Sequence, residues 1–315
     1  MWVLWTLLAA AAVVVLLSFA VYRFSLYSPR GNQNNDYAVA RTPQMDPLRD
    51  RIMDMIHTLN ERPYERVSIT SFDGLKLAGR YYHQADGAPL DMCFHGYRGT
   101  PSRDFSGGTS IYFRAGHNVL MVEERGQCGS EGHTITMGVK ERRDCLDWIA
   151  YALERFGPDQ RIILNGISMG AATVLMASGM GLPENVKGIV ADCPYTSPEA
   201  IMKKVVGDMK LPQSLSWVLI RLGARLFGGV DLTGVDAAEA VKDSPVPILL
   251  IHGEDDRFVP CEMSRRIAAA NPEMIELYTF PGAGHGLSYL VDEARYTALA
   301  EAFAGKVLGE TVKGG

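Results

Sequence analysis

Residues 161–178 read RIILNGISMGAATVLMAS, and they decide the fold of this 315-residue chain. The stretch opens with an apolar, β-branched run from Ile162 to Leu164, which is typical of a buried strand. It breaks at Gly166, places Ser168 between two glycines, and continues as an alanine-rich segment with high helix propensity. This pattern predicts a serine on a sharp strand-to-helix turn, where close packing demands small neighbours and the hydroxyl is pushed out over the sheet edge. A plain glycine-rich turn is the alternative.

A serine hydroxyl becomes a good nucleophile only beside a base that is itself oriented by an acid. The sequence holds seven histidines, and only His285 follows the last predicted strand, in the glycine-rich loop PGAGHGLSY. Its glycines allow the loop to carry the imidazole back toward Ser168. His95 and His252 each end a predicted strand just before a glycine, and we interpret them as residues that shape the sheet edge.

The acid is expected at the end of the preceding strand, where ILLIHGEDDRFVP supplies three carboxylates. We choose Asp256 from its position in the turn and keep Asp255 as the alternative. The chain order is then Ser168, Asp256, His285, which differs from the orders of chymotrypsin and subtilisin and is that of α/β-hydrolases.

Acyl transfer also requires N–H donors for the oxyanion that develops in the transition state. The residue after the serine, Met169, offers one backbone N–H, and the loop HGYRGTP after the strand LDMCF offers a second at Tyr97. A tight turn without function is the alternative for this loop. Arg98 and Arg103 beside it are candidates for binding an anionic substrate group, although solvated surface arginines are the commoner case.

The first residues form an uncharged apolar run, WVLWTLLAAAAVVVLLSFAVY, from Trp2 to Tyr22. About 20 apolar residues suffice for a helix to cross a bilayer, so we predict a membrane anchor over residues 1–27. A cleaved secretory signal is the alternative, with a small-x-small site at 18–20, but the run lacks a basic start and is long for such a signal. Arg23 and Arg30 weakly favour a cytoplasmic location for the rest of the chain.

Residues 28–47 are polar and proline-containing, which predicts a linker, and residues 48–315 are predicted to form the catalytic domain. Apolar positions indicate a helix over 48–59, and Asp73-Gly74 indicates a β-hairpin. Strands then alternate with helices, which predicts an α/β fold with a mostly parallel sheet covered on both faces. Strands are expected near 90–94, 118–123, 161–165, 186–191, 248–252 and 276–280, and helices near 104–115, 139–156, 169–179, 261–270 and 292–308. Residues 194–245 are helical in pattern and predict an inserted cap above the sheet edge where ligands bind.

Composition narrows the classes of partner and cofactor. The net charge is −5 with both signs interspersed, so no basic stripe suited to nucleic acid is present. Five scattered cysteines, without metal-ligand spacing, indicate buried thiols and favour a reducing compartment. The glycine runs lack the dinucleotide-binding arrangement. We therefore expect no metal or nucleotide cofactor, a small-molecule substrate and contact with membrane lipid; the oligomeric state is open. The five thiols are Cys93, Cys128, Cys145, Cys193 and Cys261.

Taken together, the segments HGYRG, GISMG, HGEDDRFVP and GAGHG resemble the α/β-hydrolase superfamily over about residues 48–308. The longer segments 138–157, 166–179 and 186–198 resemble bacterial membrane-anchored serine hydrolases of the cell-surface type, with monoglyceride lipases and protein depalmitoylases more distant. The resemblance implies an eight-stranded sheet and the catalytic roles given above. Gln127 and Cys128 depart from it, because a histidine and a glycine are usual there. Hydrolases of this type are described at the cell surface, whereas Arg23 and Arg30 favour a cytoplasmic location. The side of the membrane on which the catalytic domain lies therefore stays open.

The best-supported hypothesis from these residues is a membrane-anchored serine hydrolase that cleaves carboxylic esters, including lipid or acyl esters, through an acyl-enzyme. A peptidase, an aminopeptidase or an acyl-thioesterase would use the same three residues, and a carboxylate in the pocket would favour an amine-bearing substrate. A catalytically silent binding module is the least favoured hypothesis, because no triad residue is missing.

Overall fold

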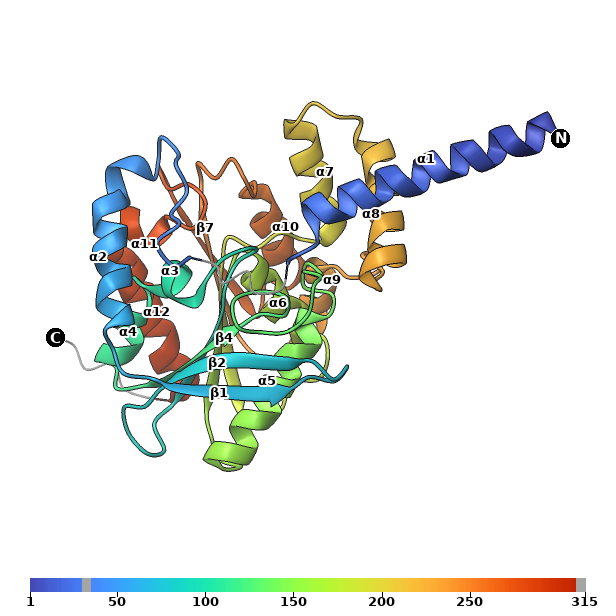
Figure 1. The fold of residues 1–315 in the computed structure, drawn as a ribbon. Helices are drawn as coiled ribbons and strands as arrows, with labels where there is room; N and C mark the ends of the chain where they lie inside the picture. The colour runs from blue at the N-terminus through green and yellow to red at the C-terminus, as the bar shows by residue number, and fades with distance from the viewer. Residues whose placement is uncertain (30–34, 310–315) are drawn as a thin grey trace.

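The computed structural model describes residues 1–29 and 35–309, whose centre is one eight-stranded sheet in the order β1-β2-β4-β3-β5-β6-β7-β8 (Figure 1). The hairpin predicted at Asp73-Gly74 joins β1 to β2, and both this pair and β2-β4 are antiparallel. All other neighbours are parallel, as predicted from the strand-helix alternation. The strands are β1 (Glu65–Thr70), β2 (Lys76–Tyr82), β3 (Leu90–Phe94), β4 (Asn118–Glu123), β5 (Ile162–Ile167), β6 (Val186–Asp192), β7 (Ile248–Gly253) and β8 (Ile275–Phe280).

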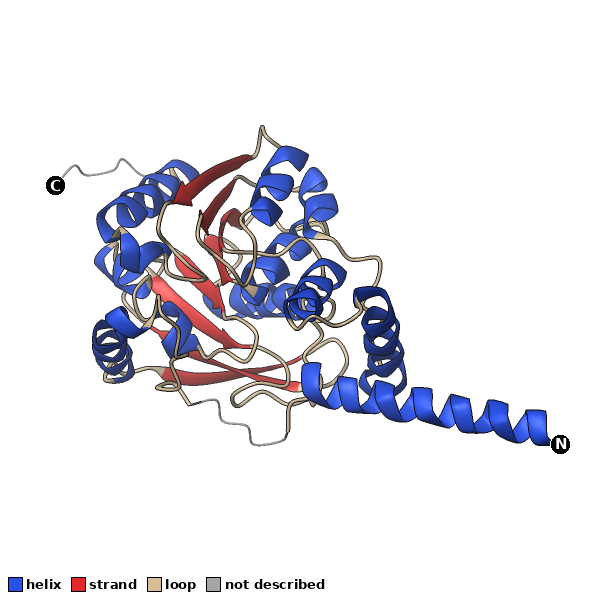
Figure 2. Ribbon diagram, turned by 90° about the horizontal axis from the view of Figure 1, so that it is seen from above, coloured by secondary structure: helices blue, strands red, loops and turns tan. Residues whose placement is uncertain are grey.

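Helices cover both faces of this sheet, which lies between them when the molecule is seen from above (Figure 2). On one face α4 (Thr109–Arg114) and α12 (Glu293–Leu308) bury one side of the parallel strands; on the other, α5 (Glu141–Phe156), α6 (Met169–Ser178) and α10 (Glu262–Ala270) bury the opposite side. Central strands buried on both sides explain the continuous apolar runs of the sequence. The carboxyl ends of the parallel strands therefore meet at one edge, where ligands bind in such sheets.

The expected helix near 104–115 is instead two short helices, α3 (Pro101–Phe105) and α4. Gly107 and Gly108 lie between them, and glycine disfavours a continuous helix. The predicted helix over 48–59 is α2 (Arg49–Asn60), which the turn η1 (Asp46–Leu48) precedes.

Helix α1 (Trp2–Ser25) extends away from the sheet domain (Figures 1 and 2) and is mostly exposed. It is the one described helix that is long and apolar enough to cross a membrane, by length and composition. Its carboxyl end packs on α8 (Gln213–Gly228), and Leu26 beyond it is fully buried in the core. Arg30, used above for orientation, lies outside the described residues.

The segment 194–245 is helical in the structure, as its pattern predicted. It forms α7 (Pro198–Asp208), α8, α9 (Ala237–Ala240) and the turn η2 (Val241–Asp243), and α7 packs against α8 beside the carboxyl end of α1 (Figure 1).

Candidate active site

Ser168 occupies the sharp turn between β5 and α6. Its φ of 56° and ψ of −112° lie in a region that residues other than glycine rarely adopt. The turn is held by the Ser168 N–H, which donates to the Asp192 carbonyl at 2.8 Å. A Cβ added at Gly166 would overlap the backbone of Ala171, and one at Gly170 would overlap the Phe94 carbonyl. The two glycines are therefore present because the turn leaves no room for side chains.

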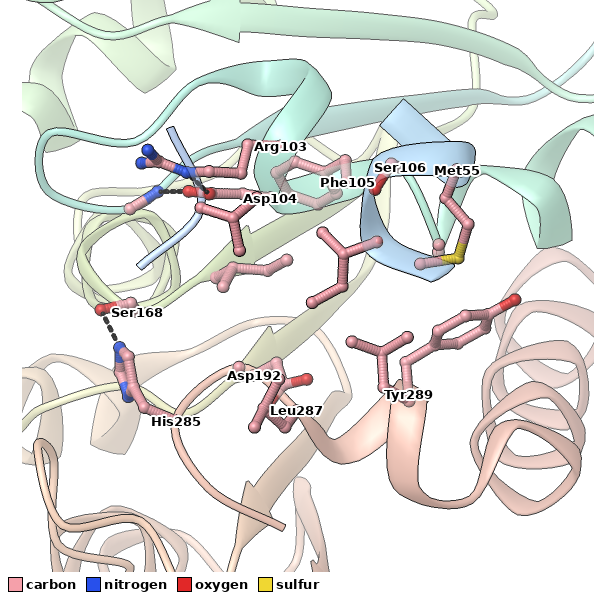
Figure 3. A pocket seen from close by; sticks show the side chains of 18 of the residues that line it. Met55, Arg103, Asp104, Phe105, Ser106, Ser168, Asp192, His285, Leu287 and Tyr289 are labelled. Atoms are coloured by element: carbon pink, nitrogen blue, oxygen red, sulfur yellow. Dashed lines mark hydrogen bonds and ion pairs between the residues drawn. The ribbon is translucent and has the colours of Figure 1, made fainter. Parts of the chain in front are cut away.

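His285 lies beside this serine, on the loop that follows β8. Its Nε2 lies 2.9 Å from the Ser168 Oγ, so the hydroxyl can donate to the ring (Figure 3). The Phe258 ring contacts the imidazole edge-on, with the ring centroids 5.0 Å apart. The loop predicted from its glycines thus brings the imidazole to the serine.

Asp256 completes a chain of hydrogen bonds behind the imidazole. Its Oδ2 accepts from the His285 Nδ1 at 2.7 Å, and its Oδ1 accepts from the N–H groups of Phe258 and Val259, each at 2.8 Å. Burial raises the pKa of Asp256, but the hydrogen bonds from His252, His285 and Val259 outweigh it and hold the pKa below its usual range. Asp256 therefore stays ionised and fixes the imidazole with Nδ1 protonated.

The alternative acid, Asp255, is exposed, and its N–H donates to the Ala283 carbonyl. No hydrogen bond or ion pair within the described residues joins its carboxylate to His285. Of the two neighbouring carboxylates, the structure brings Asp256 to the histidine.

His95 and His252 brace the loops around the site. The buried His95 ring donates from Nδ1 to the Gly96 carbonyl and accepts the Glu124 N–H at Nε2. Burial lowers the pKa of His95, which agrees with the neutral ring that these bonds require. His252 contacts the Ser264 hydroxyl through Nδ1 and the Val259 carbonyl through Nε2. Both positions shape the sheet edge, as interpreted from the sequence.

The loop 96–100 after β3 lies next to the serine, since a Cβ on Gly96 would be 3.4 Å from the Ser168 Cβ. The Asp104 carboxylate accepts the Gly96 N–H at 2.8 Å and holds the start of this loop. Neither the Tyr97 nor the Met169 N–H donates to another atom of residues 1–29 and 35–309. Both expected oxyanion donors are thus unpaired beside Ser168.

The same loop is tied to the N-terminal part of the chain. The Tyr97 hydroxyl donates to the Ser25 carbonyl at 2.6 Å, and the Arg98 guanidinium donates to the Phe24 carbonyl at 2.9 Å. Arg98 itself has a φ of 51°, a left-handed conformation that is unusual for arginine. These contacts fix the loop against the last turn of α1.

Arg103 ties the loop to the segment that follows α1. Its guanidinium donates to the Ala38 and Arg98 carbonyls at 3.0 and 2.8 Å. Its Nε also pairs with the Asp104 carboxylate at 3.3 Å. Both guanidinium groups are thus engaged within the chain, and binding of an anionic substrate group by Arg98 or Arg103 stays the less favoured alternative.

A cavity of about 330 Å³ opens beside Ser168 and His285. Its walls are largely apolar, with Met55 and Phe105 facing Leu287 and Tyr289 across the space (Figure 3). No residue of 194–245 is among the described lining residues, so the predicted cap does not wall this cavity. The N-terminal segment does so instead, through Ala38, Val39, Ala40, Met45, Ile52 and Met55. These residues are far in sequence from Ser168 and His285. The polar composition of residues 28–47 predicted a linker and did not indicate that part of it lines the cavity.

Asp192, at the end of β6, also lines the cavity (Figure 3). Its Oδ1 is buried without a hydrogen-bond partner among the described atoms. Burial raises the pKa of Asp192 to about 6, while His252 and His285 oppose that rise. We did not predict this residue, although its place at the carboxyl end of a predicted parallel strand was a usable signal.

The two positions that depart from the hydrolase pattern, Gln127 and Cys128, follow β4. Gln127 is buried, and neither its amide N nor its amide O has a described partner. Cys128 has a φ of 50°, and its thiol lies 3.7 Å from the Gly99 carbonyl. The first position thus leaves a buried amide without a described partner, and the second leaves a thiol against the loop that carries Tyr97.

Among the described residues, one group of side chains brings possible metal-ligand atoms within 4.8 Å of one another: Cys193, Asp256 and His285. Two of these three already bond to each other, and burial raises the pKa of the Cys193 thiol well above its usual value. A protonated thiol beside a hydrogen-bonded pair is a poor donor set for a metal ion.

The chain is similar to known proteins in sequence and in fold. The chain is 25% identical to the uncharacterized protein YqkD of Bacillus subtilis over 61% of this chain, and the match spans 64% of YqkD. It is 27% identical to the uncharacterized protein Rv2307c of Mycobacterium tuberculosis, over 72% of this chain and 74% of that one. The Pyrococcus furiosus esterase Pf2001 superposes with a TM-score of 0.66 at 22% identity, over 82% of this chain and 94% of the esterase, a likeness of fold.

A family model described as the prolyl oligopeptidase family matches residues 104–311. This region begins within α3, extends past the end of α12 and includes Ser168, Asp256 and His285. The eight-stranded, mostly parallel sheet is that of the α/β-hydrolases, as the resemblance implied. The chain therefore belongs to the prolyl oligopeptidase family of α/β-hydrolases.

Proposed function

We propose that this protein is a membrane-anchored serine hydrolase that cleaves carboxylic esters, with Ser168 as nucleophile, His285 as base and Asp256 as the orienting acid. One observation carries the proposal: the unbroken hydrogen-bond chain from the strained Ser168 through His285 to the ionised Asp256. In such a chain the imidazole can accept the hydroxyl proton while the carboxylate stabilises the imidazolium.

The reaction follows from these positions. The Ser168 Oγ attacks the ester carbonyl as His285 Nε2 takes its proton, and the N–H groups of Tyr97 and Met169 stabilise the oxyanion. His285 then gives the proton to the leaving alcohol, which leaves an acyl-Ser168. Water, deprotonated by the same imidazole, hydrolyses this acyl-enzyme and restores the serine.

The cavity supports a substrate with an apolar group near the carbonyl. Its lining is mostly hydrophobic and aromatic, and it begins at the serine. An acyl chain or an aryl group fits such walls by the hydrophobic effect. An acyl-thioester would present the same group to the same residues.

Anchoring of the chain in a membrane by α1 is part of the proposal. Cleavage of a secretory signal at 18–20 would remove Ser18 and Phe19, which contact Gly223 and Phe227 of α8. Because α1 runs without a break through this position and packs on the domain there, retention of the helix is favoured over cleavage.

The first test is hydrolysis of p-nitrophenyl esters of graded chain length by the full chain in detergent micelles, beside Ser168→Ala. We expect activity in the wild-type protein and its loss in the variant, by a factor of about 10⁴ or more. The preferred chain length reports the acyl group that the cavity accepts. Activity that survives in Ser168→Ala contradicts the proposal, and a wild-type protein that is inactive on every ester leaves amide substrates or a binding module.

A second candidate function, hydrolysis of amides next to a substrate amine, has one specific observation in its favour. Asp192 places a buried carboxylate with a free oxygen in the cavity wall, and an ammonium group would pair with it. Aminoacyl-p-nitroanilides and their N-acetylated forms distinguish the two functions. A preference for the free amine that Asp192→Asn abolishes would support the peptidase.

A further inference from the structure

Helix α8 carries an apolar surface that nothing in the described chain covers. Leu215, Val218 and Leu226 are 61, 55 and 54% exposed, and Met209 and Leu211 extend the surface into the loop before the helix. The other faces of α8 are buried, through Trp217, Ile220 and Ala224 against the domain and through Gly223 against α1. A helix that is apolar on its outer face as well as its inner face is unusual in contact with water.

The same surface is basic. Residues 209–228 contain Lys210, Arg221 and Arg225 and no aspartate or glutamate. Asp208 and Asp231 flank this segment and pair with Lys204 and Arg225, which leaves Lys210 and Arg221 as its other basic residues. An exposed apolar face with basic residues at its edge is typical of helices that lie in the interface of an anionic bilayer.

Helix α1 packs on α8 at Gly223 and Phe227, beside this exposed surface. The Ser18 carbonyl and the Tyr22 Cβ of α1 approach Gly223 so closely that no side chain fits there, and Phe19 packs on Phe227 with the ring centroids 4.9 Å apart. In Figure 1, α8 runs across α1 rather than along it. If α1 spans a bilayer, α8 must therefore lie close to the membrane plane.

The depth of the crossing follows from the helix rise. Ser18 lies 16 residues after Trp2, or about 24 Å along a helix with a rise of about 1.5 Å per residue. The hydrocarbon core of a bilayer is about 30 Å thick, so with Trp2 at one boundary the crossing lies about 6 Å inside the other. Interfacial helices bury their apolar faces about 5–10 Å deep.

From these four observations we infer that the outer face of α8 is a membrane-contacting surface, inserted into the headgroup and acyl boundary of an anionic bilayer beside α1. The inference rests on the proposed anchoring of α1. The surface fixes the orientation of the domain on the membrane, because two crossed helices define a plane where one helix alone leaves the domain free to tilt.

The test places an environment-sensitive fluorophore at Leu215→Cys, at Leu8→Cys in α1, and at Glu184→Cys on the far side of the domain as a control. The full chain is reconstituted in vesicles of phosphatidylcholine and phosphatidylglycerol. Some vesicles carry lipids with a nitroxide near the head group, and others carry it near the chain end. Ester hydrolysis of each labelled protein checks its folding, and labelled wild-type protein gives the background of the native cysteines.

We expect the label at 215 to shift to the blue and to lose more than half of its fluorescence to the shallow nitroxide, with less loss to the deep one. The label at 184 should respond to neither. A label at 215 that stays in water while the label at 8 is quenched overturns the inference and leaves the anchor standing. If neither label is quenched, the anchor fails too. A blue shift at 215 that depends on protein density and not on nitroxide lipid identifies a second copy of the chain as the occupant.

Discussion

The proposed triad and the proposed oxyanion loop, residues 96–100, meet at one serine, but different parts of the chain hold them. Ser168, His285 and Asp256 all follow strands of the sheet, and their hydrogen bonds run to one another and to backbone of the same sheet edge. The loop that carries Tyr97 is tied instead to α1 and to the segment after it. Ser168, His285 and Asp256 therefore form a sheet-held half of the site. The loop 96–100 forms a helix-held half, because it depends on the N-terminal helix and the segment after it.

The difference implies that the two halves respond to different perturbations. Changes within the sheet edge should remove nucleophile activation while the oxyanion loop stays intact. Changes at the end of α1 should displace the oxyanion donors while the serine stays activated. Four variants, taken from the largest expected effect to the smallest, separate these cases.

Asp256→Asn should have the largest effect, because it leaves the imidazole without the carboxylate that fixes its tautomer. We expect kcat for ester hydrolysis to fall by about 10⁴, with little change in KM. Asp255→Asn is the matched control and should keep nearly full activity, since that carboxylate is exposed. If Asp255→Asn lowered kcat more than Asp256→Asn, Asp255 would be the acid of the triad.

The sheet-held half of the site was predictable from sequence for a physical reason. A nucleophile turn needs glycines at fixed offsets, and the base and acid need loops after particular strands, so local patterns around Ser168, Asp256 and His285 indicate their positions. The strand boundaries followed in the same way, because buried parallel strands are short apolar runs. The structure brings these three residues together as predicted.

The helix-held half was not predictable in this way. The partners of Tyr97, Arg98 and Arg103 are backbone carbonyls, which every residue has, so no side-chain pattern indicates them. The cavity wall formed by 38–45 has the same origin, since it depends on where a polar segment docks. For Arg98 and Arg103 the sequence favoured solvated surface positions over an anion site, and the structure shows hydrogen bonds to the N-terminal part of the chain instead.

Asp192→Asn should have the next largest effect. It lies in the sheet-held half and should change how the free energy of unfolding depends on pH. Burial raises the pKa of Asp192 to about 6 from an ordinary 3.8, so the folded state binds the proton more tightly than the unfolded state. The free energy of unfolding contributed by Asp192 therefore falls as the pH rises through this window. We expect the variant to gain stability relative to wild type across it, by up to about 3 kcal/mol. Chemical denaturation at several pH values measures the free energy of unfolding of both proteins. If the two free energies changed with pH in the same way, the raised pKa of Asp192 would be contradicted.

Gly223→Val perturbs the helix-held half from a distance. The new side chain would overlap the Ser18 carbonyl and push α1 away from α8. Overpacking of this kind costs about 1–3 kcal/mol, which should lower the melting temperature in detergent micelles. Leu226→Val, on the exposed side of the same helix, is the control and should melt like wild type. Equal melting of all three proteins would show that α1 is not an integral part of the fold.

Tyr97→Phe is the smallest and the most specific change. It removes the hydroxyl that donates to Ser25 and leaves the ring and the backbone N–H in place. Loss of one such tie, worth about 1 kcal/mol, should displace the oxyanion donor and lower kcat by up to about tenfold. KM should not change, because the cavity that binds the acyl group does not use this hydroxyl. Tyr64→Phe, at an exposed tyrosine away from the site, controls for the loss of a hydroxyl. A lower kcat at constant KM would mean that the Tyr97 hydroxyl, through the end of α1, positions the loop. An unchanged kcat would mean that the remaining hydrogen bonds, from Arg98 and to Asp104, are enough to hold it.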